Sequence, residues 1–194
     1  MKIASTFMTL AVVATLWGCG SKSTDTTDTT EFADSTNEAM ADGAASDSSS
    51  AAVADDAEFA VAAANGGMAE VALSKIAEEK ATDPKVKEFA KQMITDHSKA
   101  NEELKTLATS KNITLPSAPN EEKQKVASDL GAKSGSDFDK AYISQMKKDH
   151  DETVKLFEDA QKEVKDTELK AFIDKTLPVI KSHAEHVKSM DKSK

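Results

Sequence analysis

The segment from Val86 to Leu107, VKEFAKQMITDHSKANEELKTL, carries the pattern that decides the fold. Its apolar or small residues recur in alternating steps of three and four, which places them on one face of an α-helix. One strongly polar residue, His97, interrupts this face. The segment therefore predicts a long amphipathic helix that buries a histidine. The predicted buried positions are Val86, Ala90, Met93, His97, Ala100, Leu104 and Leu107.

Three further segments show the same periodicity, at residues 55–81, 136–164 and 167–190. Within the second of them, QMKKDH at 145–150 repeats the order Gln-Met-x-x-Asp-His of QMITDH at 92–97. Glycine and proline are sparse in this part of the chain and strand-like alternation is absent, so we expect an all-α protein. Each of the four apolar faces contains one residue of a type that ligates metals. These residues are Glu70, His97, His150 and His183.

Capping signals indicate where the predicted helices begin and end. A capping box at Asp55 predicts the start of the first long helix, and Asp83 with Pro84 predicts the start of the second. The second and third long helices are separated by a longer crossover. In it we expect a short helix over residues 121–130, ended by Gly131. The prediction is an antiparallel four-helix bundle over 55–194 with a long crossover that contains a short extra helix.

The four polar residues are predicted to lie at one height. Two residues of an antiparallel hairpin face each other when they are equally far from the turn. The midpoint of Glu70 and His97 falls on the turn between the first two helices, and that of His150 and His183 on the turn between the last two. The midpoint of His97 and His150 falls in the crossover, so the two hairpins can be level with each other. We therefore expect one polar layer near the middle of the bundle.

Two interpretations of this layer remain open at the level of sequence. Burying a charged carboxylate costs several kcal/mol unless it is paired. In the first interpretation, Glu70, His97, His150 and His183 are ligands of one transition-metal ion: zinc, copper, manganese or iron. In the second, they form a hydrogen-bonded network that fixes the helix packing. No organic cofactor is expected.

Residues next to the histidines suggest supporting roles. Met93 and Met146 lie one turn before His97 and His150, where they would add soft copper ligands or fill the core. Asp96 and Asp149 directly precede the same histidines. They are placed to accept a hydrogen bond from a ligand on an adjacent helix, or to be solvated. We expect the fourth histidine, His186, to be exposed.

Glycine and proline inside two of the predicted helices require an explanation. Gly66 and Gly67 lie about one turn before Glu70, where each destabilises a helix by about 1 kcal/mol. They predict a close approach of another helix or a local distortion. Pro178 predicts a kink just before His183.

The N-terminus resembles that of an exported bacterial lipoprotein. One lysine precedes an apolar run over residues 3–17, which is too short for an ordinary membrane span and typical of a signal peptide over 1–18. The run ends in Leu-Trp-Gly-Cys, a lipobox-like sequence that predicts lipidation of Cys19. Gly20 follows, without the aspartate that would retain the protein in the inner membrane. We expect an anchor in the outer membrane, with the protein facing the periplasm.

Residues 19–54 form the expected tether between this anchor and the helical domain. The segment is rich in Ser, Thr, Asp and Ala and lacks apolar periodicity, so we expect it to be flexible. Cys19 is the only cysteine of the chain, which excludes an intramolecular disulfide and a thiolate metal site.

Composition argues against several classes of function. The formal net charge is −9 and the sequence contains no arginine, so no basic patch indicates nucleic-acid binding. No Ser/His/Asp order, phosphate-binding loop or acidic pair indicates hydrolytic chemistry, which makes an enzyme the least favoured class. Protein partners are not indicated by any motif.

Four blocks of residues carry a family resemblance: GGMAEV at 66–71, MITDHSKAN at 93–101, MKKDH at 146–150, and TLP at 176–178 with His183. In these blocks the chain resembles the bacterial family known as domain of unknown function 4142. The resemblance implies a ferritin-like four-helix fold in an exported, outer-membrane protein, and it implies no established activity. True di-iron ferritins use Glu-x-x-His motifs, whereas Ile94, Lys147 and Ile180 stand three positions before the histidines here. A single ion therefore suits the sequence better than a di-iron centre.

Overall fold

The computed structural model describes residues 28–43 and 48–192. In these residues the chain forms six helices and no strand. The predicted signal peptide and Cys19 lie outside the described residues. None of the described helices combines the length and the apolarity that a membrane crossing needs. The helices are α1 (Thr29–Gly43), α2 (Ser48–Lys80), α3 (Pro84–Ser110), α4 (Glu121–Gly131), α5 (Gly135–Glu163) and α6 (Thr167–Lys192).

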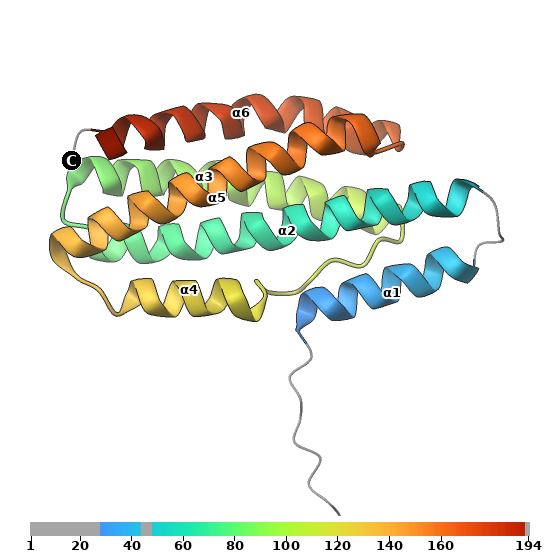
Figure 1. Cartoon of the computed structure of the whole chain (residues 1–194), viewed down its shortest axis with the longest axis horizontal. Helices are drawn as coiled ribbons and strands as arrows, with labels where there is room; N and C mark the ends of the chain where they lie inside the picture. Colours follow the sequence, from blue (N-terminus) through green and yellow to red (C-terminus); the bar gives the residue numbers. More distant parts are fainter. Residues whose placement is uncertain (1–27, 44–47, 193–194) are drawn as a thin grey trace, which may run out of the picture.

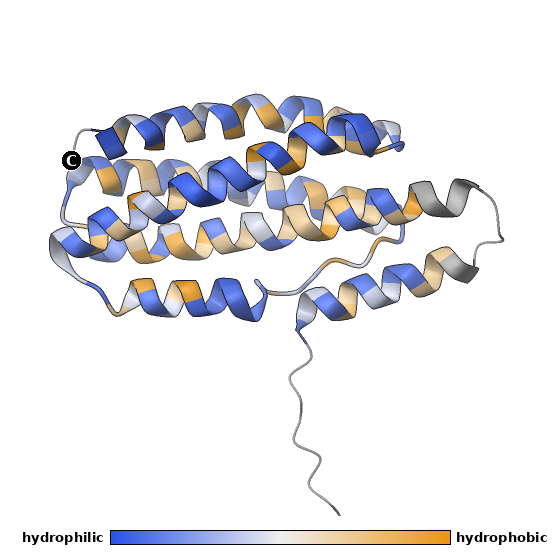
Figure 2. Cartoon of the chain, viewed as in Figure 1, coloured by the Kyte–Doolittle hydropathy of each residue, from blue (hydrophilic) through white to orange (hydrophobic). Residues whose placement is uncertain are grey.

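The four long helices lie side by side along the long axis of the molecule (Figure 1). The turn at 81–83 joins α2 to α3, and the turn at 164–166 joins α5 to α6, so that each pair forms an antiparallel hairpin. The crossover from α3 carries α4 along α2 before the chain enters α5 (Figure 1). Hydrophobic and hydrophilic residues alternate at the helical spacing around α3, α5 and α6, and the hydropathy colours are drawn in Figure 2. The observed bounds of α3, α4, α5 and α6 agree with the sequence prediction to within about two residues.

The core consists of two apolar clusters, one on each side of the predicted polar layer. One cluster contains Leu73, Phe89 and Tyr142, and the other contains Phe59 and Phe157. In every long helix, residues on one side of the polar position enter the first cluster and residues on the other side enter the second. The polar layer is thus held between two packed regions, where burial of apolar surface stabilises the helix contacts.

A buried carboxylate from the opposite hairpin fixes each of the two tight turns. Asp139 of α5 accepts hydrogen bonds from the backbone N–H of Thr82 at 3.0 Å and of Asp83 at 3.0 Å, and from the Thr82 hydroxyl at 2.6 Å. Asp56 of α2 accepts from the backbone N–H groups of residues 165 and 166 at 2.8 and 3.0 Å. Because these contacts cross between hairpins, they also fix the height of one hairpin against the other.

The start of α2 differs from the prediction. The helix begins at Ser48 and runs through Asp55, so Asp55 does not cap its N-terminus. The neighbouring Asp56 is only 8% exposed and binds the α5–α6 turn, a long-range role that a local capping pattern does not reveal. The predicted cap of α3 is confirmed, because the Asp83 side chain accepts a hydrogen bond from the backbone N–H of Lys85.

Part of the predicted flexible tether is helical. Within the range 19–54, α1 occupies Thr29–Gly43 and packs beside α2. Asn37 anchors it, since its amide donates to the carbonyl of Thr114 at 3.0 Å and accepts from the Thr114 N–H at 2.8 Å. Ala33 on the same face is fully buried. The tether prediction is wrong for these residues, because small alanines and one asparagine suffice for docking on a preformed surface.

We expect Asp139→Ala to lower the free energy of unfolding by about 2 to 3 kcal/mol, because it removes a charged acceptor from the donors of the α2–α3 turn. Urea denaturation measures the change. Asp137→Ala is the control, since Asp137 lies on the same helix but is exposed. Equal stability of the two variants would contradict the role given to Asp139.

Candidate metal centre

The four polar residues predicted to share a layer do meet in the core. Glu70 comes from α2, His97 from α3, His150 from α5 and His183 from α6, and their exposed fractions are 1, 6, 0 and 1%. The histidine ring centroids are 5.3 to 5.7 Å apart. The common height inferred from the turn midpoints is therefore confirmed.

One ring nitrogen of each histidine is engaged by an oxygen of the surrounding protein. His150 donates through Nδ1 to the carbonyl oxygen of Met146 at 2.8 Å. His183 donates through Nε2 to Oδ2 of Asp96 at 2.9 Å. Nδ1 of His97 lies 3.0 Å from Oε2 of Glu70, an ion-pair contact whose angle falls outside hydrogen-bond geometry. These contacts orient the three rings and fix which nitrogen carries the proton in His150 and His183.

The other ring nitrogen of each histidine has no hydrogen-bond partner among the described residues. These atoms are Nε2 of His97, Nε2 of His150 and Nδ1 of His183. One ring nitrogen from each of the three residues lies within 4.8 Å of the others. Buried polar atoms are normally paired, so a nitrogen without a partner on each of three neighbouring rings calls for a physical reason. A metal ion supplies one, since imidazole nitrogens with free lone pairs are common ligands of zinc, copper and iron.

The electrostatics of the layer separate one charged pair from two neutral rings. Burial acts to raise the pKa of Glu70, but His97, with smaller contributions from the other two histidines, lowers it to about 2. Burial acts to lower the pKa of His97, and the Glu70 carboxylate raises it above its ordinary value. Burial lowers the pKa of His150 and of His183. Without a metal, the layer therefore holds a Glu70–His97 ion pair beside two neutral imidazoles.

Glu70 lies in the predicted layer, but its carboxylate points toward a histidine ring and not into a shared metal site. Its carboxylate contacts Nδ1 of His97, and its Oε1 lies 3.5 Å from Nδ1 of His150. Within the described part of the chain, the set of ligand atoms close enough to share an ion contains the three histidines and not Glu70. The structure thus places Glu70 as the group that orients and charges His97, in place of the predicted fourth ligand.

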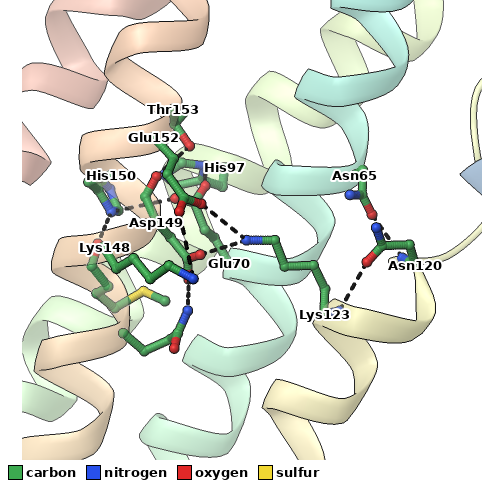
Figure 3. Close-up of polar contacts among 12 residues, drawn as sticks. Asn65, Glu70, His97, Asn120, Lys123, Lys148, Asp149, His150, Glu152 and Thr153 are labelled. Atoms are coloured by element: carbon green, nitrogen blue, oxygen red, sulfur yellow. Dashed lines mark hydrogen bonds and ion pairs between the residues drawn. The ribbon is translucent and has the colours of Figure 1, made fainter.

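The two aspartates that precede histidines have different roles. Asp96 contacts His183 on the adjacent helix, as predicted for an acceptor that orients a ligand. Asp149 binds away from the histidine rings. Its oxygens accept hydrogen bonds from Lys123 of α4 at 2.7 Å and from Gln145 at 3.0 Å (Figure 3). The prediction for Asp149 is wrong because its side chain leaves α5 toward α4.

The remaining predicted neighbours have simple outcomes. Met93 and Met146 are fully buried members of one apolar cluster, which makes them core residues, and the carbonyl of Met146 binds His150. His186 is exposed, as predicted, and its ring packs against Phe89 at a centroid distance of 5.1 Å. The helix α2 continues through Gly67 without interruption.

Lys123 is a residue near the site that sequence reasoning missed. It is half-buried, and burial acts to lower its pKa while the hydrogen bond to Asp149 and the charges of Asp149, Glu152 and Glu70 raise it above the ordinary value. Figure 3 shows its side chain reaching from α4 toward α5 beside the histidine layer. A lysine on a short polar helix carries no sequence signal for such a contact, because only the position of the crossover creates it.

The fold and the site define the class: an all-helical protein whose core contains three converging histidines that fit a metal ion. The chain belongs to the family described as Domain of unknown function (DUF4142), whose model matches residues 39–190. No curated protein matches the sequence. A solved structure, CopM in the Cu(II)-bound form, resembles the chain with a TM-score of 0.61 and 18% identity. The match covers 71% of this chain and 96% of that chain, and at this identity the likeness extends to the fold alone.

In the metal-free protein, we expect Glu70→Gln to bring the pKa of His97 below its ordinary 6.5, because the burial that lowers it is no longer opposed by the carboxylate. NMR titration of the histidine ring protons measures this pKa. If the pKa of His97 stays above 6.5 in the variant, Glu70 is not the group that raises it.

The same pair predicts how stability depends on pH. The pKa of Glu70 is lowered on folding, so its contribution is present above the ordinary 4.5 and is lost as the pH falls toward about 2. We expect this acid-side loss in urea denaturation of the metal-free wild type. The Glu70→Gln variant, which has no carboxylate to protonate at this position, should lack that part of the loss.

Proposed function

We propose that this chain binds a single transition-metal ion in the core of a ferritin-like four-helix bundle. The ligands are His97, His150 and His183. Two observations carry the proposal. Each of the three rings has one nitrogen that lacks a hydrogen-bond partner among the described residues, while an oxygen engages the other nitrogen. One ring nitrogen from each histidine lies within 4.8 Å of the others. This is the arrangement in which outer oxygens orient metal-ligating histidines.

The donor set favours zinc or copper over the harder ions. Three imidazole nitrogens suit Zn²⁺ and Cu²⁺, whereas manganese prefers more oxygen ligands. The solved structure of similar fold was determined with Cu(II) bound, which supports copper as the first ion to test. Storage, buffering or protection against metal stress is the role that we propose for this site.

A purely structural role is the alternative, and one observation favours it. The Glu70–His97 ion pair compensates the buried charge without a metal. In that case the layer fixes helix register, and the protein serves as a non-catalytic structural or interaction protein. The two functions differ in metal dependence, because a structural layer loses stability on substitution whether or not metal is added.

We also propose that the protein is exported and held at the outer membrane by a lipid on Cys19, facing the periplasm. The support is the signal-peptide pattern of residues 1–18 and the lipobox-like Leu-Trp-Gly-Cys that ends at Cys19. Metal ions from outside the cell pass through the periplasm before they enter the cytoplasm. A protein at that location is therefore well placed to buffer them.

Elemental analysis of the purified protein after dialysis against zinc, copper, manganese or iron tests the metal site. We expect one ion per chain. The metal affinity should fall at least about 100-fold in His150→Ala and in His183→Ala, which is more than is expected for a residue that only hydrogen-bonds to a ligand. Below the raised pKa of His97, metal binding should release a proton, because the charged ring must lose it to become a ligand.

His186→Ala is the matched control for these variants, since His186 lies one turn from His183 but is exposed. It should keep full metal binding. Failure of the wild-type protein to take up any of the four metals stoichiometrically would contradict the proposed function and favour the structural alternative.

The proposed anchor is tested separately by Cys19→Ser. We expect the wild-type protein in the membrane fraction and the variant in the soluble fraction, because the serine hydroxyl does not receive the thioether-linked lipid. Cell fractionation with mass spectrometry of the N-terminal peptide measures both properties. An unmodified Cys19 in the wild-type protein would overturn the lipoprotein proposal.

A further inference from the structure

Two charged contacts cover the histidine layer on two of its sides. Lys123 of α4 bonds to Asp149 of α5 with 2.7 Å between Nζ and Oδ1 (Figure 3). Between α3 and α6, the Asp96–His183 hydrogen bond at 2.9 Å lies across the layer. The histidines are 0 to 6% exposed, so an ion needs a route that either breaks one of these contacts or avoids both.

A small cavity borders the layer inside the core, among α2, α3, α5 and α6. Its volume is about 20 Å³, which is room for about one water-sized species. Glu70 and His97 line it, and both Glu70 oxygens and Nε2 of His97 are buried without a hydrogen-bond partner in the described residues. Buried polar atoms that lack a hydrogen-bond partner beside such a cavity favour a small polar occupant. The other lining residues include Gly67, Asn101, Thr153 and Thr176.

Asn101 joins this cavity to the surface. The half-buried side chain also lines a larger surface groove formed by α2, α3 and the crossover, together with Met68, Ser98 and Pro116. Gly67 faces it from α2. A methyl group at Gly67 would overlap Oδ1 of Asn101 and would lie 3.1 Å from its Cγ. The glycine therefore provides the space in which the Asn101 amide stands between groove and cavity.

We propose that the metal ion reaches the histidines between α2 and α3, past the side chain of Asn101, and contacts Glu70 in the cavity before it is bound. This proposal rests on the proposed function, because it describes the access route of the same metal site. The ligand class is a divalent transition-metal ion that has lost most of its hydration shell. Asn101 acts as a positioning residue of this route and is not one of the final ligands.

The chemistry of the lining suits such a passage. An ion that leaves water needs oxygen atoms to replace its hydration shell, and an apolar passage would raise the barrier. Asn101, Thr153, Thr176 and Glu70 supply oxygen atoms to a cavity lining that also contains Leu104, Phe157, Phe172 and Ile180. Thr153 donates its hydroxyl proton to the carbonyl of Asp149 at 2.8 Å, which leaves its oxygen lone pairs available.

The rate of metal uptake tests this route. The metal-free chain is mixed with Zn²⁺ or Cu²⁺, each supplied alone on a chromophoric chelator, and stopped-flow absorbance follows the transfer. We expect Asn101→Leu, which keeps the size but removes the polar atoms, to slow uptake by about tenfold, equivalent to about 1.4 kcal/mol in the barrier. The final content should remain one ion per chain. Asn101→Ala, which widens the passage, should take up metal faster than wild type.

Gln92→Leu is the matched control, because Gln92 is an exposed amide on the same helix, and it should keep the wild-type rate. Lys123→Met and Asp96→Asn open the two covered sides. If either accelerates uptake while the Asn101 variants keep the wild-type rate, the proposed route is wrong and the metal site stands. If the wild-type chain takes up no ion, the proposed function and the route both fail.

Discussion

The contact between the Glu70 carboxylate and the His97 ring constrains the rest of the structure. Both groups are almost completely buried, and a carboxylate in a helical core is tolerated only when an opposite charge or donors meet it. The pair therefore fixes α2 against α3 at one height. His150 and His183 complete the layer from the other hairpin. Burial lowers the pKa of both rings, which favours their neutral form.

The apolar core is organised around this layer. One cluster packs on each side of it, so a shift of one helix by a single turn would move a histidine into apolar surroundings and an apolar residue into the layer. Asp56 and Asp139 strengthen the same register from the ends of the molecule, because each binds the tight turn of the opposite hairpin. The polar layer and the two turns thus hold the three histidine rings close together in the core.

Sequence reasoning predicted the layer well and its chemistry only in part. Helical spacing is constant, so the positions of His97 and His183 on their helices and their distance from the turns could be calculated without coordinates. Glu70 was predicted as a ligand, but the structure shows it beside Nδ1 of His97. The direction of a side chain depends on its rotamer and on neighbours from other helices, which periodicity does not encode. The contacts of Lys123 escaped prediction for the same reason.

The sequence by itself determined the all-helical class, the Asp83–Pro84 cap, the short helix within the crossover and the common height of four polar residues. These features depend on local geometry and on regular helical rise. Only the tertiary structure decided that α1 docks through Asn37, that Asp56 binds a distant turn, and which nitrogen of each histidine remains without a partner among the described residues. These features depend on contacts between residues far apart in the chain, whose relative positions exist only after the helices have packed.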